Sequence, residues 1–393
     1  MADTADVIVI GAGVQGSALA FHLASRGAKV TVVEKSVVAA GATGRSSGLV
    51  RVHYELLAEA KLAWFAQDWF RHWDERVGGE SGFTVTGFVW IEPSRNRERL
   101  AANCAAHAAL GVDSSIIDAD EIRRIAPMLQ VGDEVGAYEP NSGYADPTMT
   151  ASSLINAAKA RGARLVQGAE VTAIRQAGGR VTGVATTKGD VDAPVIVNAA
   201  GCWTKRVGDL AGMDLPLRVW RHDTGYLGIP AAVQAQGRLP VVIDNANGSY
   251  FRPEGSDMVL IGLEDDDQIG GSPDRDTADA APTFELRAAE RIIARVPGMV
   301  DGEFRTSHSG QDGLSPDQRA YLGPVGSAGP EGFFLDCGHS GTGFKTAPAI
   351  GLGMAEWILD GASHTVDLAP FTYQRYLDGK PLVGEHGEEI LWR

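Results

Sequence analysis

The stretch VIVIGAGVQG, residues 7–16, decides the fold of this chain. Its first four residues form a β-branched run of the kind that makes a buried parallel strand. The glycines that follow fit the pattern G-x-G-x-x-G, which joins such a strand to a helix. We therefore predict a strand over 7–10, a helix that continues to about Arg26, and a second strand over 29–34.

The pattern predicts a site for a dinucleotide. Gly11 permits the tight turn, Gly13 lets the backbone approach a pyrophosphate, and Gly16 lets the helix lie close to the strand. The phosphates would sit at the N-terminus of the helix, where free N–H groups and the helix dipole favour negative charge. Glu34 ends the second strand, where a carboxylate holds ribose hydroxyls. An acid there disfavours NADP, whose 2′-phosphate it would repel.

A second stretch, GATGRSSGLVR over residues 41–51, favours FAD over NAD. It is rich in glycine and hydroxyl groups and follows the second strand directly. An NAD dehydrogenase usually continues into ordinary βα units at this point. We expect a loop and a helix start that press backbone N–H groups against an extended ligand.

Length and composition bound the class of protein. A chain of 393 residues with 44% apolar and 22% charged residues predicts a globular protein of two domains. The formal charge of −15 argues against nucleic acid and against an anionic membrane surface as partners. Cys104, Cys202 and Cys337 have no metal-ligand spacing and fit a reducing compartment, as buried thiols rather than a disulfide framework.

The chain also lacks the sequence signals of export and membrane insertion. Asp3 and Asp6 precede the first apolar run, in place of the positive region of a secretory signal. No apolar stretch approaches the roughly 20 residues that span a bilayer. We expect a cytoplasmic protein without a membrane span.

The middle of the chain predicts a different sheet and several helices. We expect a strand over 83–92, a helix over 94–110, a short helix over 120–125, and a helix over 148–161 capped by Asp146 with Pro147 at its first position.

A block rich in strands follows. The expected strands cover 164–166, 170–175, 180–187 and 195–198, with a hairpin turn at Gly178-Gly179, and a further strand-rich stretch covers 241–263. The acidic run 264–267 is either a solvated loop or a feature that repels anions. We expect the last helix over 346–359.

Four blocks give the chain its resemblance to a known family. They are the glycine turn with Glu34, the stretch 41–51, VIVNAAGCW over 195–203, and GHSGTGFK over 338–345. In this order they resemble the FAD-dependent amino acid oxidases, the group of sarcosine oxidases, glycine oxidases, dimethylglycine dehydrogenases and D-amino acid oxidases.

The resemblance implies an α/β fold of the glutathione-reductase-like type. It has a Rossmann-type FAD-binding domain and an inserted substrate domain with a mixed or antiparallel sheet. We expect a discontinuous FAD domain over 1–82, 137–212 and 306–376. The substrate domain would cover 83–136 and 213–305, followed by a tail over 377–393.

The resemblance also implies cofactor-binding residues spread over these blocks. They are Gly11, Gly13, Val14, Gln15, Gly16, Glu34, Lys35, Thr43, Arg45, Ser46, Ser47, Gly48, Leu49, Val171, Ala200, Gly201, Trp203, Gly341, Thr342, Gly343, Phe344 and Lys345. In the family the last block faces the flavin edge that gains negative charge on reduction, where Lys345 would add a full positive charge. The alternative is a glycine turn followed by a surface lysine.

Arg51, Lys345, His53 and Tyr250 are the residues that we expect at the substrate. By resemblance to the sarcosine oxidases, Arg51 grips a carboxylate with its planar fork and Lys345 completes the site. His53 and Tyr54 lie near Arg51 in the sequence. A structural salt bridge is the alternative role for Arg51, and a merely hydrogen-bonded ring is the alternative for His53.

The implied reaction is hydride transfer from a carbon that bears nitrogen to flavin N5, which gives an imine that water hydrolyses. The substrate would be a small amino acid or N-alkyl amino acid, resembling sarcosine, glycine or proline, and oxygen or another acceptor would take the electrons. A 2-hydroxy acid dehydrogenase, or a FAD-holding subunit of a larger complex, is the alternative. The chain could then be a homo-oligomer or one subunit of a hetero-oligomer.

Four features depart from the family or limit the resemblance. Leu260 aligns with the lysine that activates oxygen in sarcosine oxidase, which makes a dehydrogenase plausible. Glu264 aligns near a pocket histidine and either recognises a second amino group or is solvated. We expect no folate-binding extension of the kind that the dimethylglycine enzymes have, because only a short tail follows the last expected helix. The histidine spacings predict no metal site.

We predict that FAD is bound without a covalent link. Relatives with covalent flavin attach it to a histidine in the early loop or to a cysteine in the late strand region. Here Arg45 holds the loop position, and the later stretch 313–316 reads GLSP. Acid precipitation of the purified protein should leave all the flavin in the supernatant, measured by absorbance. Flavin that stays with the precipitate would contradict this prediction.

Overall fold

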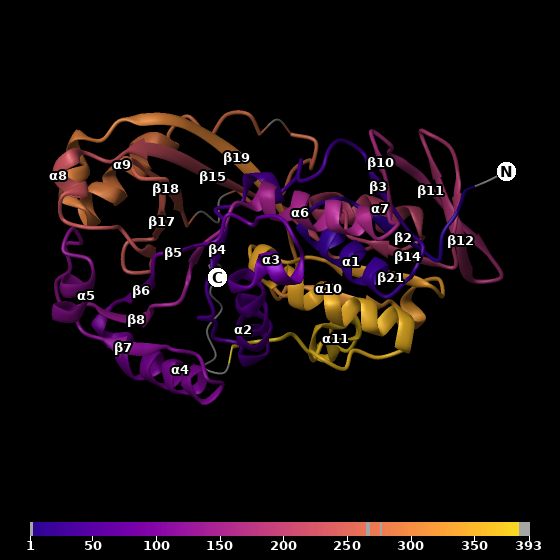
Figure 1. Cartoon of the computed structure of the whole chain (residues 1–393), viewed down its shortest axis with the longest axis horizontal. Helices are drawn as coiled ribbons and strands as arrows, with labels where there is room; N and C mark the ends of the chain where they lie inside the picture. Colours follow the sequence, from indigo (N-terminus) through magenta and orange to yellow (C-terminus); the bar gives the residue numbers. More distant parts are fainter. Residues whose placement is uncertain (1–2, 265–267, 276, 385–393) are drawn as a thin grey trace.

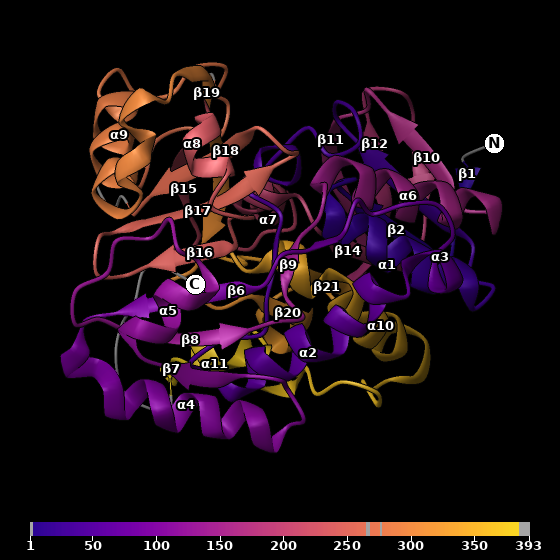
Figure 2. The same ribbon diagram turned by 60° about the vertical axis from the view of Figure 1, so that its left-hand side comes forward.

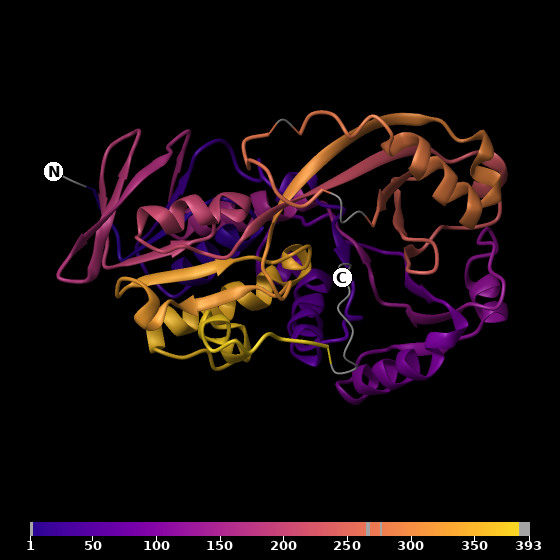
Figure 3. The same ribbon diagram turned by 180° about the vertical axis from the view of Figure 1, so that it is seen from behind.

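The computed structural model describes residues 3–264, 268–275 and 277–384. Two halves lie side by side along the long axis, one built around a six-stranded sheet and the other around an eight-stranded sheet (Figure 1). The chain passes repeatedly between them, so each half contains segments that are far apart in sequence (Figure 3).

The six-stranded sheet is the centre of the first half. Its strand order is β10-β3-β2-β14-β21-β20, and all pairs are parallel except β20 with β21. The strands are β2 (Val7–Ile10), β3 (Val30–Glu34), β10 (Arg164–Gln167), β14 (Val195–Asn198), β20 (Tyr321–Pro324) and β21 (Phe333–Cys337). The predicted strands over 7–10, 29–34, 164–166 and 195–198 are thus confirmed.

Both faces of this sheet are covered, which explains the unbroken apolar runs. Along β2, Val7 and Val9 pack into one core together with three helices, α1 (Val14–Ser25), α6 (Pro147–Ala160) and α10 (Gly343–Asp360). Ile8 and Ile10 point the other way, because side chains alternate along a strand. They pack into a second core with α7 (Thr204–Leu210) and a smaller four-stranded sheet.

That smaller sheet has the order β1-β13-β12-β11 and lies at the end of the molecule beside α7 (Figure 1). Its strands are β1 (Asp3–Thr4), β11 (Val171–Ala177), β12 (Arg180–Thr186) and β13 (Val191–Asp192). The predicted hairpin at Gly178-Gly179 joins β11 to β12, and both glycines have positive φ.

The eight-stranded sheet forms the second half, in the order β19-β15-β18-β17-β16-β6-β8-β7. Only β16 and β6 run parallel. The strands are β6 (Phe88–Glu92), β7 (Ser115–Ile117), β8 (Val135–Glu139), β15 (Arg218–Gly228), β16 (Val241–Asp244), β17 (Ser249–Glu254), β18 (Met258–Leu263) and β19 (Phe304–Leu314). The expected mixed sheet is therefore present.

Helices cover the outside of this sheet, as Figure 2 shows for α9 and α4. The helices are α4 (Arg97–Ala109), α5 (Ala119–Ile125), α8 (Ala231–Gln234) and α9 (Phe284–Arg295). One face of the sheet packs on α9 through Val242, Phe251 and Ile261. The opposite face, with Tyr250 and Leu260, forms a core that also includes Leu49 and Tyr144 from a small sheet between the halves.

Other described elements complete the chain. They are α2 (Leu57–Arg71), α3 (Trp73–Arg76) and α11 (Gln374–Leu377), with the short strands β4 (Leu49–Val50), β5 (Thr84–Val85) and β9 (Gly143–Tyr144). None of the helices in the described residues is both long enough and apolar enough to cross a membrane.

Two predicted elements were placed wrongly. The strand expected over 83–92 is broken at Gly87, whose φ of 76° turns the chain, so that β5 joins the small sheet and only β6 enters the large one. The last helix begins at Gly343, three residues before the expected start, and contains Pro348 in its first turns. Pro348 is the sixth helical residue, so it removes the N–H that would otherwise bond to the carbonyl oxygen of Phe344.

Other sequence predictions agree with the structure. Asp146 caps α6 by accepting a hydrogen bond from the N–H of Met149, and Pro147 holds the first helical position. The expected helix over 94–110 begins as a short 3-10 turn before α4. The expected domain boundaries at 136–137 and 305–306 fall inside β8 and β19, and the division into domains stays a prediction. Residues 265–267 of the acidic run lie outside the described residues.

His22 on α1 gives the fold a testable dependence on pH. Its ring is buried, and Nε2 lies 3.1 Å from the carbonyl oxygen of Pro348. Burial lowers the pKa of His22 from 6.5 to about 4. Between these values the unfolded chain binds a proton that the folded chain does not, so stability falls as the pH drops from 6.5 towards 4. We expect a loss of about 3 kcal/mol over this range.

Urea unfolding followed by circular dichroism between pH 4.5 and 7 measures this loss. His22→Gln should reduce the pH dependence, to which the buried His53 and His107 also contribute, whereas the exposed His72→Gln should leave it unchanged. An equal pH slope in wild type and His22→Gln would show that another group is responsible.

Candidate functional site

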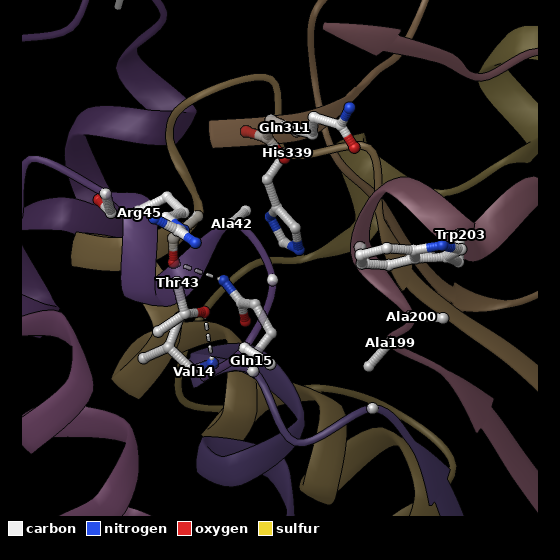
Figure 4. A pocket seen from close by; sticks show the side chains of 18 of the residues that line it. Val14, Gln15, Ala42, Thr43, Arg45, Ala199, Ala200, Trp203, Gln311 and His339 are labelled. Atoms are coloured by element: carbon white, nitrogen blue, oxygen red, sulfur yellow. Dashed lines mark hydrogen bonds between the residues drawn. The ribbon is translucent and has the colours of Figure 1, made fainter. Parts of the chain in front are cut away.

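A cavity of about 770 Å³ runs between the two halves. Its wall includes the glycine turn, the stretch after β3, the start of α10 and one face of the large sheet. In Figure 4, Val14, Gln15 and Thr43 lie on one side of the cavity, and Ala200 and Trp203 lie across from them. The predicted blocks, which are far apart in the sequence, therefore meet around one space.

Most predicted site residues line this cavity. They are Gly11, Gly13, Val14, Gln15, Glu34, Lys35, Thr43, Arg45, Ser46, Ser47, Leu49, Arg51, Val171, Ala200, Gly201, Trp203, Tyr250, Gly341, Gly343, Phe344 and Lys345. Four predicted residues, Gly16, Gly48, Thr342 and His53, do not belong to the lining.

The glycine turn brings α1 against the end of β2. A Cβ atom on Gly16 would lie 2.0 Å from the carbonyl oxygen of Gly11, so any side chain there would push the helix away. Gly11 itself has a φ of 107°, which favours glycine. Gly16 thus acts through packing, and the open N-terminus of α1 faces the cavity at Val14 and Gln15.

Glu34 stands where the sequence placed it, at the end of β3 beside the turn. Its two carboxylate oxygens accept hydrogen bonds from the N–H groups of Ala12, at 2.9 Å, and Ser36, at 2.7 Å. These bonds fix the carboxylate at the cavity wall. Its remaining acceptor capacity suits the two hydroxyls of a ribose.

The stretch after β3 forms a 3-10 turn over Thr43–Arg45 instead of another βα unit. The Thr43 hydroxyl accepts a hydrogen bond of 3.0 Å from the N–H of Val14, which ties this turn to the start of α1 (Figure 4). A Cβ on Gly13 would lie 3.2 Å from the same hydroxyl. The loop therefore packs against the glycine turn, and no side chain among the described residues covers the backbone of Gly13 on the side of the cavity.

The start of α10 meets α1 at the cavity. The side-chain amide of Gln15 donates a 2.7 Å hydrogen bond to the carbonyl oxygen of Gly343. The other side-chain atom of Gln15, Oε1, is buried and has no hydrogen-bond partner among the described residues. Two helix N-termini and an unpaired buried acceptor thus face the cavity, and both N-termini favour negative charge.

Arg51 is buried at the cavity wall, with 1% of its surface exposed. The guanidinium carbon lies 4.4 Å from the ring centre of Tyr54 and 5.3 Å from that of Trp90. Nη1 donates to the carbonyl oxygen of His53, whereas Nε and Nη2 have no hydrogen-bond partner within the described chain. Arg51 forms no ion pair with a carboxylate among the described residues, so the alternative of a structural salt bridge is not observed.

Lys345 is buried beside Arg51 and is therefore not a surface lysine. Its Nζ donates a 2.8 Å hydrogen bond to the hydroxyl of Tyr54. Burial, reinforced by the charge of Arg51, lowers the pKa of Lys345 well below its usual range. Burial and Arg51 thus disfavour the full positive charge that we expected on Lys345. An anion bound nearby would favour it again.

A buried carboxylate lies close to this pair. Burial raises the pKa of Glu59 to about 7, although Arg319, 3.2 Å away, opposes the shift. Lys345 and Arg51 also favour the ionised form of Glu59. Arg51 therefore keeps an uncompensated positive charge at the inner end of the cavity, as a site for a carboxylate requires.

His53 does not lie where its predicted substrate role needs it. The ring turns away from the cavity, because it stacks near Trp90 at 5.1 Å and meets His107 at 5.0 Å between ring centres. Its Nε2 lies 3.1 Å from the side-chain amide of Asn103. Burial, together with the charges of His107 and Arg51, lowers the pKa of His53 well below its usual value.

The other residues singled out in the sequence also lie outside the lining of the cavity. Leu260 is buried in the core shared by the two halves, and Glu264 is exposed. Gly48 holds a turn with positive φ against Ala145, and the hydroxyl of Thr342 bonds to the carbonyl oxygen of His339. The three cysteines are free and buried.

Several lining residues were missed by the sequence analysis. Trp220 and His222 both face the cavity from β15, and their two-residue spacing on a strand was the available signal. His339 lies inside a block that had been recognised, and its Nε2 is 3.0 Å from Asp336. Gln311 comes from β19, beside His339 in Figure 4, and nothing in its local sequence marked it.

The rim near Trp203 joins the two halves. Trp203 donates a 2.7 Å hydrogen bond to Asp274, and Arg206 pairs with the same carboxylate. Lys35 lies 3.6 Å above the Trp203 ring. A loop from the second half therefore borders the dinucleotide side of the cavity.

The arrangement as a whole defines a dinucleotide-binding oxidoreductase. The family model described as FAD dependent oxidoreductase (DAO) matches residues 6–357, and the chain belongs to this family. The cofactor is FAD.

Relatives of known function span most of this chain. Human mitochondrial sarcosine dehydrogenase is 30% identical over 91% of the chain and 40% of its own length. The β subunit of sarcosine oxidase from Arthrobacter sp is 24% identical over 97% of the chain and 93% of its own length. The chain spans less than half the length of the mitochondrial dehydrogenases that it matches.

A solved structure confirms the predicted fold class. L-proline dehydrogenase from P. horikoshii superposes with a TM-score of 0.89 at 23% identity, over 97% of this chain and all of that one. The glycine turn, the unpaired Oε1 of Gln15 and the bare backbone near Thr43 are the features that fit FAD here. The turn and the α1 N-terminus would hold its phosphates, and Glu34 its ribose.

Glu34 gives a direct test of this cofactor site. Glu34→Ala removes the ribose acceptor and the carboxylate that fixes the turn, so the Kd for FAD should rise at least about tenfold. Titration of the flavin-free protein with FAD, followed by fluorescence quenching, measures the change. Glu331→Ala, which removes an exposed carboxylate paired with Arg180, should bind FAD like wild type. Equal Kd values for Glu34→Ala and wild type would rule out the assigned role.

Proposed function

We propose that this chain oxidises the C–N bond of a small amino acid or N-alkyl amino acid, giving an imine that water hydrolyses. The observation that carries the proposal is the buried Arg51 guanidinium on the wall of the cofactor cavity, with the amine of Lys345 beside it. A buried guanidinium with two unpaired donors costs free energy unless an anion completes it.

A carboxylate is the anion that fits best. The free Nε and Nη2 of Arg51 form one edge of the planar guanidinium, which matches the two oxygens of a carboxylate. The Tyr54 and Trp90 rings hold the guanidinium plane, so little ordering remains to be done when the substrate binds. Lys345 and Arg51 both contact Tyr54, so the amine of Lys345 would also lie near the bound carboxylate.

The rest of the wall supports oxidation in a dry site. When bound, FAD accepts the hydride from the substrate carbon. Trp220, Ile243 and Tyr250 line the same cavity and exclude water with large apolar surfaces. With the carboxylate held at Arg51, these walls would fix the direction of the substrate C–H bond.

The same charges favour the reactive form of an amine. An ammonium group placed near Arg51 and Lys345 is destabilised by like charge and by burial. The substrate nitrogen would therefore lose its proton on binding, without a strong general base. This favours an amine substrate over a 2-hydroxy acid, because the hydroxyl group of the acid would need a side chain to remove its proton.

The names of the relatives also favour an amine. Human sarcosine dehydrogenase, human dimethylglycine dehydrogenase and the 4-methylaminobutanoate oxidase of Paenarthrobacter nicotinovorans all carry N-methyl amine substrates in their names. A 2-hydroxy acid would also satisfy Arg51 and is the outcome to be distinguished by experiment.

A second candidate is a FAD-bearing subunit that acts only in a complex. It is favoured by the near full-length match to the β subunit of sarcosine oxidase. Such a chain would still bind the carboxylate substrate but would need a partner for complete turnover.

Arg51→Ala and Arg51→Lys test the proposal. Loss of the buried guanidinium should raise the substrate concentration for half-maximal flavin reduction by about 100-fold or more, and lysine should restore only part of it. The exposed Arg305→Ala is the matched control and should behave like wild type.

The measurement is anaerobic bleaching of the visible flavin band with a panel of N-methyl, cyclic and primary amino acids and 2-hydroxy acids. Reduction by hydroxy acids alone would refute C–N oxidation. An unchanged midpoint in Arg51→Ala would remove Arg51 from the substrate site.

A further inference from the structure

Behind Arg51, away from the cavity, three side chains meet that the proposed reaction does not use. They are His53 from the loop after β4, His107 from α4 and Glu139 from the end of β8. Each is at most 1% exposed, and one ligand atom from each lies within 4.8 Å of the other two.

Each of the three retains an atom without a hydrogen-bond partner among the described residues. These atoms are Nδ1 of His53, Nδ1 of His107 and Oε1 of Glu139. One unpaired buried polar atom is costly, and three neighbouring residues that each retain one indicate a shared ligand.

The imidazoles are arranged as metal ligands usually are. Nε2 of His107 lies 2.9 Å from the carbonyl oxygen of Tyr54, which can only accept, so Nε2 carries the proton and Nδ1 keeps its lone pair. Nε2 of His53 lies 3.1 Å from the Asn103 amide. As placed, Nδ2 of Asn103 faces this nitrogen and donates to it. Rotating the side-chain amide by 180° would put its oxygen there instead, so that Nε2 of His53 donates as well and Nδ1 is free. Ligating histidines commonly donate their second N–H in this way.

Glu139 is oriented by its neighbours. Its Oε2 accepts hydrogen bonds from the N–H of Val52, at 2.9 Å, and from the hydroxyl of Ser142, at 2.6 Å. Burial raises the pKa of Glu139, and these two bonds oppose that shift. They also leave Oε1 for a ligand.

Two nearby arginines, Arg99 and Arg51, would repel a cation bound by these three side chains. Arg99 is paired with Glu55 at 3.3 Å and Glu92 at 3.5 Å, so its charge is largely compensated. Arg51 is not, and it weakens the affinity for a cation. Glu139, when ionised by the bound cation, supplies an opposite charge in direct contact, which offsets the repulsion from Arg51.

We propose that His53, His107 and Glu139 form a structural site for Zn²⁺. Two imidazole nitrogens and one carboxylate oxygen are ligands that zinc favours, with water in the fourth position. None of the three residues lines the cavity, so the metal would not touch the substrate. The site revises the prediction of no metal, which rested on sequence spacing, because its ligands come from three separate elements.

The metal would lock the loop that carries Arg51. His53 accepts a hydrogen bond from Arg51 through its carbonyl oxygen, so a metal on the His53 ring would tie the substrate arginine to α4 and β8. This consequence goes beyond the proposed function, and metal binding itself can be tested without any turnover.

The experiment is metal analysis of the purified flavoprotein by plasma mass spectrometry, after dialysis against Zn²⁺ and removal of free metal. We expect one Zn²⁺ per chain in wild type and near none in His107→Gln and Glu139→Gln. His72→Gln, which changes an exposed histidine beside a carboxylate, is the control and should keep the metal. FAD content measured in parallel shows that each variant has folded.

X-ray absorption at the zinc edge on the wild-type protein covers the case in which the variants do not fold. Nitrogen and oxygen ligands at about 2.0–2.2 Å without sulfur would support the site. Wild type that takes up no Zn²⁺, variants that keep full stoichiometry, or a sulfur ligand at about 2.3 Å would each overturn it.

Discussion

The close approach of α1 to the end of β2 is the constraint on which the rest of the structure depends. Gly16 has room for no side chain, because the carbonyl oxygen of Gly11 occupies the place of a Cβ atom. Farther along, a Cβ on Gly351 would lie 2.8 Å from the backbone of Ala18, so α10 is equally close to α1. Two helices packed this tightly bring their N-termini to one cavity, and Gln15 joins them by its bond to Gly343.

The proposed substrate site depends on a second feature, the positive charge of Arg51, which no carboxylate among the described residues neutralises. Arg51 is held by aromatic faces and one carbonyl group, which orient it without neutralising it. Lys345 and Tyr54 extend this arrangement towards Glu59. Burial without full pairing lowers stability and raises the free energy gained when an anion arrives. The fold can bear this cost because large cores lie on both sides of the sheet.

The sequence predicted the parts whose cause is local. Runs such as 7–10 and 195–198 specify buried strands, and the glycine turn, Glu34 and the 338–345 block each contain their own geometric reason. The break at Gly87 was missed because one strand-like run serves two sheets. Trp220, Gln311 and the His53–His107–Glu139 cluster depend on strand pairing and helix placement between distant segments. Apart from the two-residue spacing of Trp220 and His222, no local pattern encodes such contacts.

The interleaving of the chain between the two halves limits how such an enzyme can change through evolution. Each half is assembled from segments separated by parts of the other, and Leu49 and Tyr144 share a core with the large sheet. Neither half is a portable module that recombination could exchange in one piece. New substrate ranges would therefore arise by replacing individual side chains on β15 and β17, such as those at His222 and Tyr250, while the cofactor frame is inherited intact.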